Sequence, residues 1–357
     1  MQEKIREVLS GVIDPNTGKD LVFSKALKKV TTEDGKTTVQ IELDYPAKTQ
    51  GPVIEEMVRA KLVEAGIPAD VKISQNIIAH EVQRGVKVFD SVRNIIAVSS
   101  GKGGVGKSTV SANLALALQQ EGAKVGLLDA DVYGPSQPTM LGITDRPYSV
   151  DGKTLEPMIA HGLQVASVGV LIDPDQPMIW RGPLAVSALQ QLLKQTNWKD
   201  LDYLIVDMPP GTGDIQLSLS QEVPLTGAVV VTTPQDIALM DARKGLVMFE
   251  KVNVPILGII ENMATHICSK CGHEEHIFGE GGAAKMAEQY GVELLGELPL
   301  DINIRLSMDK GEPIVISEPD SKVAQAYRDI ARKLAIAVSK KNKDYSAKMP
   351  SIKVSDT

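Results

Sequence analysis

The run Ser100-Gly101-Lys102-Gly103-Gly104-Val105-Gly106-Lys107-Ser108-Thr109 constrains the fold of this chain more than any other stretch. An apolar segment, residues 94–99, precedes it and predicts a strand, and apolar residues at helical spacing follow it. Glycines allow a tight turn whose N–H groups point inward, and together with a helix N-terminus they form a cradle for phosphate oxygens. The pattern predicts a nucleotide-binding loop that extends from Gly101 to Thr109.

The two lysines of this loop are expected to act differently. Lys107 should reach the β- and γ-phosphates of ATP, and the neighbouring Ser108 hydroxyl should ligate Mg²⁺. Lys102 lies five positions before Lys107, on the approach to the loop, whose own phosphates Lys107 already serves. We interpret Lys102 as a catalytic group delivered to the nucleotide of a facing subunit, like an arginine finger. The alternative is a solvated surface lysine.

Carboxylates follow two further segments that predict buried strands. Residues 124–128 lead into Asp129 and Asp131, and residues 203–206 lead into Asp207 and a Pro-Pro-Gly turn. Ligands of open α/β sheets bind at the carboxyl ends of the strands, so these groups should face the loop. We expect Asp131 to orient the attacking water, Asp207 to hold Mg²⁺ and Asp129 to assist with the metal.

The composition narrows the class of protein. The chain has 357 residues, 43% of them hydrophobic and 23% charged, which is an ordinary globular balance. A net charge of -7 argues against a general affinity for nucleic acid or anionic membranes. No apolar run is long enough to cross a bilayer, and the N-terminus is too charged for a signal peptide. We therefore expect a cytoplasmic protein with neither nucleic acid nor membrane as its partner.

The only two cysteines, Cys268 and Cys271, form a C-x-x-C in a polar loop. They could share zinc with further ligands from His266, His273 or His276, form a redox dithiol, or be structural thiols. A fourth interpretation is favoured: two copies of the chain meet about a two-fold axis and combine their cysteines into a Cys₄ set, as in a [4Fe-4S] cluster.

These motifs together resemble a known family. The K-G-G-x-G-K-S run is similar to the deviant P-loop of the nitrogenase iron protein, MinD and ParA group of dimeric ATPases. With the acidic strand ends and the C-x-x-C followed by Gly-His, residues from about 92 to 338 resemble Mrp/ApbC iron–sulfur cluster carriers. The resemblance implies a homodimeric ATPase that holds a labile cluster through Cys268 and Cys271 and transfers it to apoproteins. It also implies that assembly factors are partners of the protein. It also implies that Asn262 contacts adenine, and without other cysteines no second cluster is expected.

The expected organisation has three parts. Residues 1–85 predict a small α/β domain, similar to one found in iron–sulfur assembly factors, with helices near 1–10 and 52–64 and strands near 38–43 and 71–78. It lacks a cysteine at its proline-containing turn, so a docking or client-binding role is predicted. Residues 92–340 predict an α/β P-loop NTPase domain with a doubly wound, mainly parallel sheet. Residues 341–357 are expected to form a flexible tail.

Two alternatives of other classes remain. A positioning ATPase of the MinD or ParA kind, which cycles on membrane or DNA, would need a basic amphipathic C-terminal helix or a basic face. Neither feature is evident in the sequence. A zinc-bridged, nucleotide-dependent scaffold would differ mainly in the metal that the cysteines hold.

Overall fold

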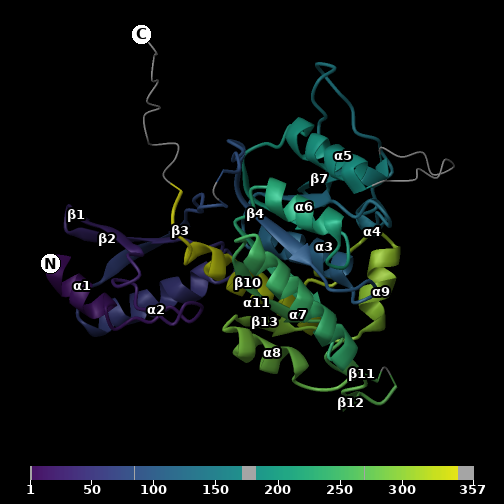
Figure 1. Cartoon of the computed structure of the whole chain (residues 1–357). Coiled ribbons are helices and arrows are strands. Elements are labelled where there is room, and N and C mark those ends of the chain that lie inside the picture. The colour runs from purple at the N-terminus through teal and green to yellow at the C-terminus, as the bar shows by residue number, and fades with distance from the viewer. Residues whose placement is uncertain (1, 84, 171–181, 269, 345–357) are drawn as a thin grey trace, which may run out of the picture.

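A three-stranded sheet and an eight-stranded sheet organise the computed structural model, which describes residues 2–83, 85–170, 182–268 and 270–344. The smaller sheet belongs to an N-terminal domain and the larger one to an α/β domain beside it (Figure 1).

The N-terminal domain packs helices against a mixed sheet. Its strand order is β1-β2-β3, with β1 antiparallel and β3 parallel to β2. Residues at helical spacing on α2, namely Ile54, Val58 and Leu62, are buried, and so are alternate residues of β2. The elements are α1 (Gln2–Leu9), β1 (Leu27–Glu33), β2 (Lys36–Leu43), α2 (Gly51–Glu64) and β3 (Ala69–Gln75).

The large sheet has the order β13-β10-β9-β4-β8-β5-β7-β6, and every pairing is parallel except that of β6 with β7. Its central strands are mostly apolar and almost entirely buried because helices cover both faces. The strands are β4 (Val92–Ser99), β5 (Val125–Asp129), β6 (Met158–Ala160), β7 (Leu163–Ser167), β8 (Leu201–Asp207), β9 (Gly227–Thr232), β10 (Ile256–Glu261) and β13 (Leu294–Glu297).

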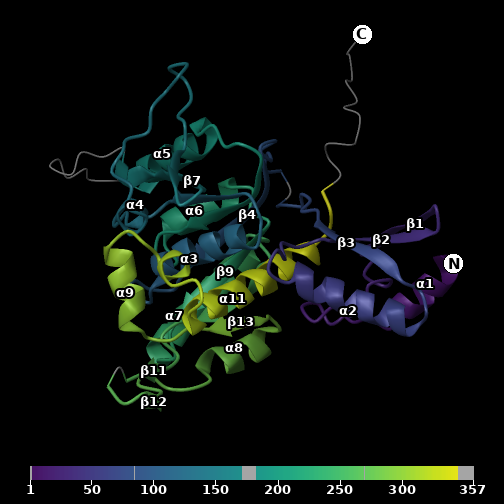
Figure 2. The same ribbon diagram turned by 180° about the vertical axis from the view of Figure 1, so that it is seen from behind.

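Two hydrophobic clusters separate the helices by face. α3, α10 and α11 contribute to one, which continues into the N-terminal domain, and α5 to α8 contribute to the other (Figure 2). This arrangement confirms the predicted doubly wound, mainly parallel α/β fold. The helices are α3 (Lys107–Gln120), α4 (Gln137–Met140), α5 (Gly182–Gln195), α6 (Asp214–Glu222), α7 (Asp236–Lys251), α8 (Gly282–Tyr290), α9 (Ile302–Asp309), α10 (Ile314–Ser317) and α11 (Lys322–Ser339), with a 3₁₀ turn η1 at Val168–Val170.

The connection between the domains pairs with the chain after α11. Backbone hydrogen bonds join Glu81 to Asn342 and Asp344 to Ala79, at 2.9 and 3.1 Å. Residues 341–344, the predicted start of the tail, thus lie against the connection, and residues 345–357 fall outside the described part of the chain.

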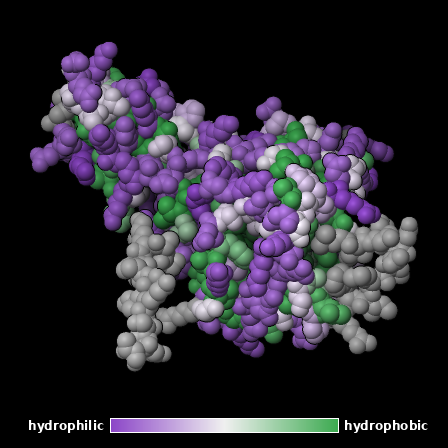
Figure 3. Space-filling model, turned by 90° about the horizontal axis from the view of Figure 1, so that it is seen from above, coloured by the Kyte–Doolittle hydropathy of each residue, from purple (hydrophilic) through white to green (hydrophobic). Residues whose placement is uncertain are grey.

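The surface carries mostly polar side chains. On the face shown in Figure 3, hydrophilic residues predominate and the N-terminal domain projects from the larger body. Of the helices in the described residues, none combines the length and apolarity needed to cross a bilayer.

Hydrogen bonds attach the N-terminal domain to a buried ion pair at the end of α3. Glu121 is fully buried and pairs with the buried Arg332 of α11. Its carboxylate also accepts hydrogen bonds from the Thr49 N–H, at 3.0 Å, and from the Thr49 hydroxyl, at 2.7 Å. Next to it, Gln75 Nε2 donates to the Gly122 carbonyl at 2.8 Å. A polar junction thus accompanies the hydrophobic cluster that the two domains share.

We predict that Glu121→Ala lowers the free energy of unfolding by about 3–5 kcal/mol, because it leaves the buried Arg332 without its buried partner. Asp329, which pairs with the same arginine but is half-exposed, is the matched control. Asp329→Ala should cost less than about 1 kcal/mol. Urea unfolding measures both, and equal losses would contradict the assigned role of the junction.

Candidate functional site

The loop before α3 adopts a shape that only glycine permits at two positions. At Gly101, a Cβ would lie 2.1 Å from the backbone carbon of Asp241 in α7. At Gly106, which has φ +81°, a Cβ would lie 2.2 Å from Asn262 Nδ2. The loop is thus held between α7 and the residue after β10, with its N–H groups available at the helix N-terminus.

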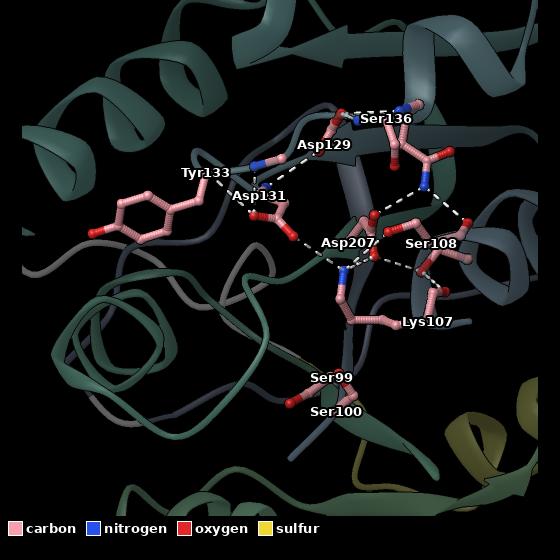
Figure 4. A network of polar contacts seen from close by, with 12 residues as sticks. Ser99, Ser100, Lys107, Ser108, Asp129, Asp131, Tyr133, Ser136 and Asp207 are labelled. Carbon is pink, nitrogen blue, oxygen red and sulfur yellow. Dashed lines mark hydrogen bonds and ion pairs between the residues drawn. The ribbon is translucent and has the colours of Figure 1, made fainter. Parts of the chain in front are cut away.

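Lys107 lies at the centre of a polar network formed at the carboxyl ends of β5 and β8 (Figure 4). Its ammonium, on a side chain only 6% exposed, is 2.5 Å from Asp207 Oδ1 and 3.9 Å from Asp131 Oδ2. Ser108 Oγ is 3.2 Å away. A buried ammonium needs nearby negative charge, so binding of a phosphate requires Lys107 to exchange carboxylate for phosphate oxygens.

The arrangement fits a divalent cation. Ser108 Oγ and Asp207 Oδ1 both contact the Lys107 ammonium, so these oxygens already surround a position that favours positive charge. Hydroxyl and carboxylate oxygens are the ligands that Mg²⁺ prefers.

Asp207 is held by further side chains. Ser111 Oγ donates to Asp207 Oδ1 at 3.0 Å, and Gln137 Nε2 donates to Asp207 Oδ2 at 2.9 Å. Sequence reasoning missed both residues. Ser111 lies one helical turn after Lys107, a spacing that could have revealed it, whereas no local pattern points to Gln137.

The segment after β5 folds around Asp129. Asp129 Oδ2 accepts hydrogen bonds from the Ser136 and Gln137 N–H groups, both at 3.1 Å, and from Ser167 Oγ at 3.0 Å. Burial, followed by the negative charge of Asp207, raises the pKa of Asp129 to about 7.

Asp131 faces the same network from the next turn of the chain. Asp131 Oδ1 accepts from the N–H groups of Tyr133 and Gly134, at 3.3 and 3.2 Å, while Oδ2 is the atom nearest Lys107. Figure 4 shows the exposed Tyr133 ring pointing away from the network.

The remaining predicted nucleotide residues surround this network. Gly103 and Gly104 are exposed, Val105 is buried and Thr109 is partly buried in the first turn of α3. Asn262 follows β10, and its Nδ2 donates to the Val105 carbonyl at 2.9 Å. Lys102 is partly buried, and within the described residues its side chain takes part in no hydrogen bond or ion pair. The structure thus brings Lys107, Asp131 and Asp207 together and leaves Lys102 outside their network.

The two cysteines lie at the tip of a hairpin formed by β11 (His266–Ile267) and β12 (Glu274–Glu275). Cys268 is partly buried and Cys271 is exposed. The Cys268 N–H donates to the His273 carbonyl at 2.8 Å, closing the turn. N–H groups of Lys270 and Cys271 point at the Cys268 sulfur and lower the pKa of this thiol, which favours the thiolate that binds metals. The hairpin is on the side remote from the N-terminal domain (Figures 1 and 2).

The described residues of one copy of the chain do not complete a metal site around these cysteines. Among residues 2–83, 85–170, 182–268 and 270–344, no three His, Cys, Asp or Glu side chains gather in a way that could hold a metal. His266 Nδ1 and His276 Nδ1 lie 3.2 and 3.0 Å from the carbonyls of Leu300 and Ala264, respectively. The histidines considered for zinc therefore do not converge with the cysteines.

Comparisons with known proteins identify both parts of the chain. Residues 91–335 match the family described as NUBPL iron-transfer P-loop NTPase, and residues 2–75 match a family described as iron-sulfur cluster assembly protein. A relative from Salmonella typhimurium is 52% identical over 93% of this chain and 92% of its own length. One from Synechocystis is 45% identical over 94% and 98%. Both are named iron-sulfur cluster carrier protein, and the predicted resemblance is confirmed.

Solved structures agree with the fold. A nucleotide-binding protein from Archaeoglobus fulgidus in complex with ADP is 37% identical, covers 66% of this chain and 92% of its own, and has a TM-score of 0.58. The cell division ATPase MinD from Pyrococcus furiosus is 25% identical, covers 68% and 98%, and has a TM-score of 0.53.

We predict a pH effect on stability from Asp129. Its pKa is raised from 3.8 to about 7 in the folded chain, so the folded protein keeps a proton that the unfolded chain releases. The free energy of unfolding should therefore fall as the pH rises through this range. Asp129→Asn should reduce the fall, because the amide does not titrate. Urea unfolding at successive pH values measures the difference, and identical pH slopes for the two proteins would contradict it.

Proposed function

The chain belongs to the iron-transfer P-loop NTPases, and we propose that it binds iron–sulfur clusters and transfers them to apoproteins as a homodimer that hydrolyses ATP. The observation that carries the proposal is a C-x-x-C at a hairpin tip, with Cys271 exposed and Cys268 partly buried, in the same domain as a complete phosphate-binding loop.

The accessible position of the cysteines, exposed for Cys271 and partly buried for Cys268, suits a cluster that is passed on. One chain offers two thiolates, and a [4Fe-4S] cluster takes four. A second copy, related by a two-fold axis, supplies the other pair with the same geometry. A cluster held at such a surface is open to the ligands of an apoprotein, which can replace the cysteines one at a time.

For the nucleotide, each residue of the network has a separate task. The loop N–H groups and Lys107 bind the phosphates of ATP, and Asn262 contacts the adenine. Ser108 and Asp207 would hold Mg²⁺, which neutralises charge on the phosphates when bound. Asp131 orients a water for attack on the γ-phosphorus, which breaks the bond to the β–γ bridging oxygen. Lys102 of the facing subunit stabilises the charge that develops on the transferred group.

Two kinds of relative support this assignment. The Archaeoglobus protein binds ADP, and a MinD from Pyrococcus horikoshii, 26% identical with a TM-score of 0.50, is complexed with Mg-ADP. The Lys102 side chain lies in the loop but has no hydrogen-bond or ion-pair partner among the described residues, which supports action on a second subunit. Relatives named as carriers cover 93% and 94% of the chain, whereas MinD covers 68% of it, so the carrier function is preferred over positioning.

The N-terminal domain is proposed to dock clients or assembly factors. It matches an assembly-protein family and contains no cysteine, so it would contribute contacts to protein partners rather than ligands to the cluster. The location of the whole protein in the cytoplasm stays a prediction, and so does the absence of nucleic acid and membrane partners.

We predict that Cys271→Ala abolishes cluster binding while ATP turnover is retained, because the hairpin lies outside the phosphate network. Anaerobic reconstitution with iron and sulfide, followed by visible absorption and metal analysis, measures this. His273→Ala is the control: it should leave the cluster unchanged, since only the cysteines are ligands. If metal analysis finds zinc in place of iron in the unaltered protein, and both variants lose this zinc, the zinc-bridged scaffold is favoured instead.

We predict that Lys102→Ala keeps nucleotide affinity but lowers ATP turnover at least about a thousand-fold, the effect of removing a charge delivered in trans. Mixing Lys102→Ala chains with Asp131→Asn chains should restore part of the turnover. One composite site then has Asp131 from the first chain and Lys102 from the second. A mixture as inactive as its components would contradict action between subunits.

A further inference from the structure

Gln137 is a buried amide whose side chain reaches the carboxylate at the end of β8. The residue is fully buried at the start of α4. Its Nε2 lies 2.9 Å from both Asp207 Oδ2 and the Ser108 carbonyl, so one amide group connects the proposed Mg²⁺ ligands of β8 and α3. Its own backbone N–H is bonded to Asp129 Oδ2 at 3.1 Å, which fixes the start of the side chain.

The other end of this amide has no hydrogen-bond partner in the part of the chain that the structure describes. Gln137 Oε1 is buried and accepts no hydrogen bond from the described residues. A buried acceptor without a donor costs about 1–3 kcal/mol, a cost that an apolar side chain of similar volume would avoid. The use of a glutamine here therefore depends on the two bonds that its NH₂ group donates.

The bonds of Asp207 show what these contribute. Oδ1 interacts with Lys107 Nζ and Ser111 Oγ, whereas among the described residues Oδ2 interacts with Gln137 alone. When Lys107 moves to the phosphates, Asp207 loses its closest partner. Gln137 and Ser111 are then the side chains that keep the carboxylate in place.

We propose that Gln137 is a positioning residue for Mg²⁺ binding. Its amide holds Asp207 Oδ2 and keeps the carboxylate oriented when the Lys107 ammonium leaves Asp207 to contact the phosphates. The inference rests on the proposed function, because it takes Asp207 and Ser108 as the Mg²⁺ site. The segment after β5 then contacts Asp207 at the end of β8 directly through Gln137, in addition to the role proposed for Asp131.

The test measures the affinity of the full chain for ADP by calorimetry, in EDTA and across a range of Mg²⁺ concentrations. For Gln137→Met, which keeps the volume and removes the amide, affinity in EDTA should stay within about twofold. The Mg²⁺ concentration that gives half of the affinity gain should rise about tenfold, as expected for loss of a charge-assisted hydrogen bond. If Gln137→Met does not fold, Gln137→Asn replaces it. The asparagine amide is one methylene shorter and does not reach Asp207, so the same rise in the required Mg²⁺ concentration is expected.

Gln216→Met is the matched control. Gln216 is also buried with an unpartnered Oε1, but its Nε2 bonds Ser99 Oγ and not a carboxylate, so its Mg²⁺ dependence should match that of the unaltered protein. An unchanged Mg²⁺ dependence in Gln137→Met, with a clear Mg²⁺ effect in the unaltered chain, would overturn the inference and leave the proposed function intact. A lack of any Mg²⁺ effect in the unaltered chain would overturn both the inference and the assignment of Ser108 and Asp207 as Mg²⁺ ligands.

Discussion

The pairing of one buried ammonium with carboxylates organises the functional part of this molecule. Lys107 begins α3, and its charge lies among Asp207 of β8 and Asp131 after β5, where water does not screen it. Because these groups come from separate elements, the loop, the strand ends and the segment after β5 must adopt compatible positions before the charge is compensated. The parallel register makes this feasible, since Asp129 and Asp207 are direct neighbours on adjacent strands.

Local patterns were sufficient to predict most of the large domain. The apolar runs that become β4, β8 and β9 are buried on both faces, so hydrophobicity alone reveals them, and the carboxyl ends of parallel strands meet at one edge. β1 was missed because Lys28 and Lys29 interrupt any alternation and its residues are largely exposed. The two-residue strands β11 and β12 are too short to leave a pattern.

Contacts between distant segments could not be predicted in the same way. Gln137 reaches Asp207 across 70 positions of sequence, and Thr49 reaches Glu121 across 72. Nothing local marks either residue, because what makes them important is the charge they meet after folding. Asn262 is intermediate: its place after β10 was predictable, but its bond to Val105 links the phosphate-binding loop to the segment that leads into the cysteine hairpin. Both centres of the proposed chemistry thus share one edge of the sheet.

The junction at Glu121 places the N-terminal domain at the far end of the helix that begins in the phosphate-binding loop. α3 starts in the phosphate-binding loop and ends against Thr49, so a single straight rod of 14 residues, about 21 Å long, spans the distance from nucleotide to N-terminal domain. The phosphate-binding loop and the contact with the N-terminal domain therefore lie at opposite ends of the same helix.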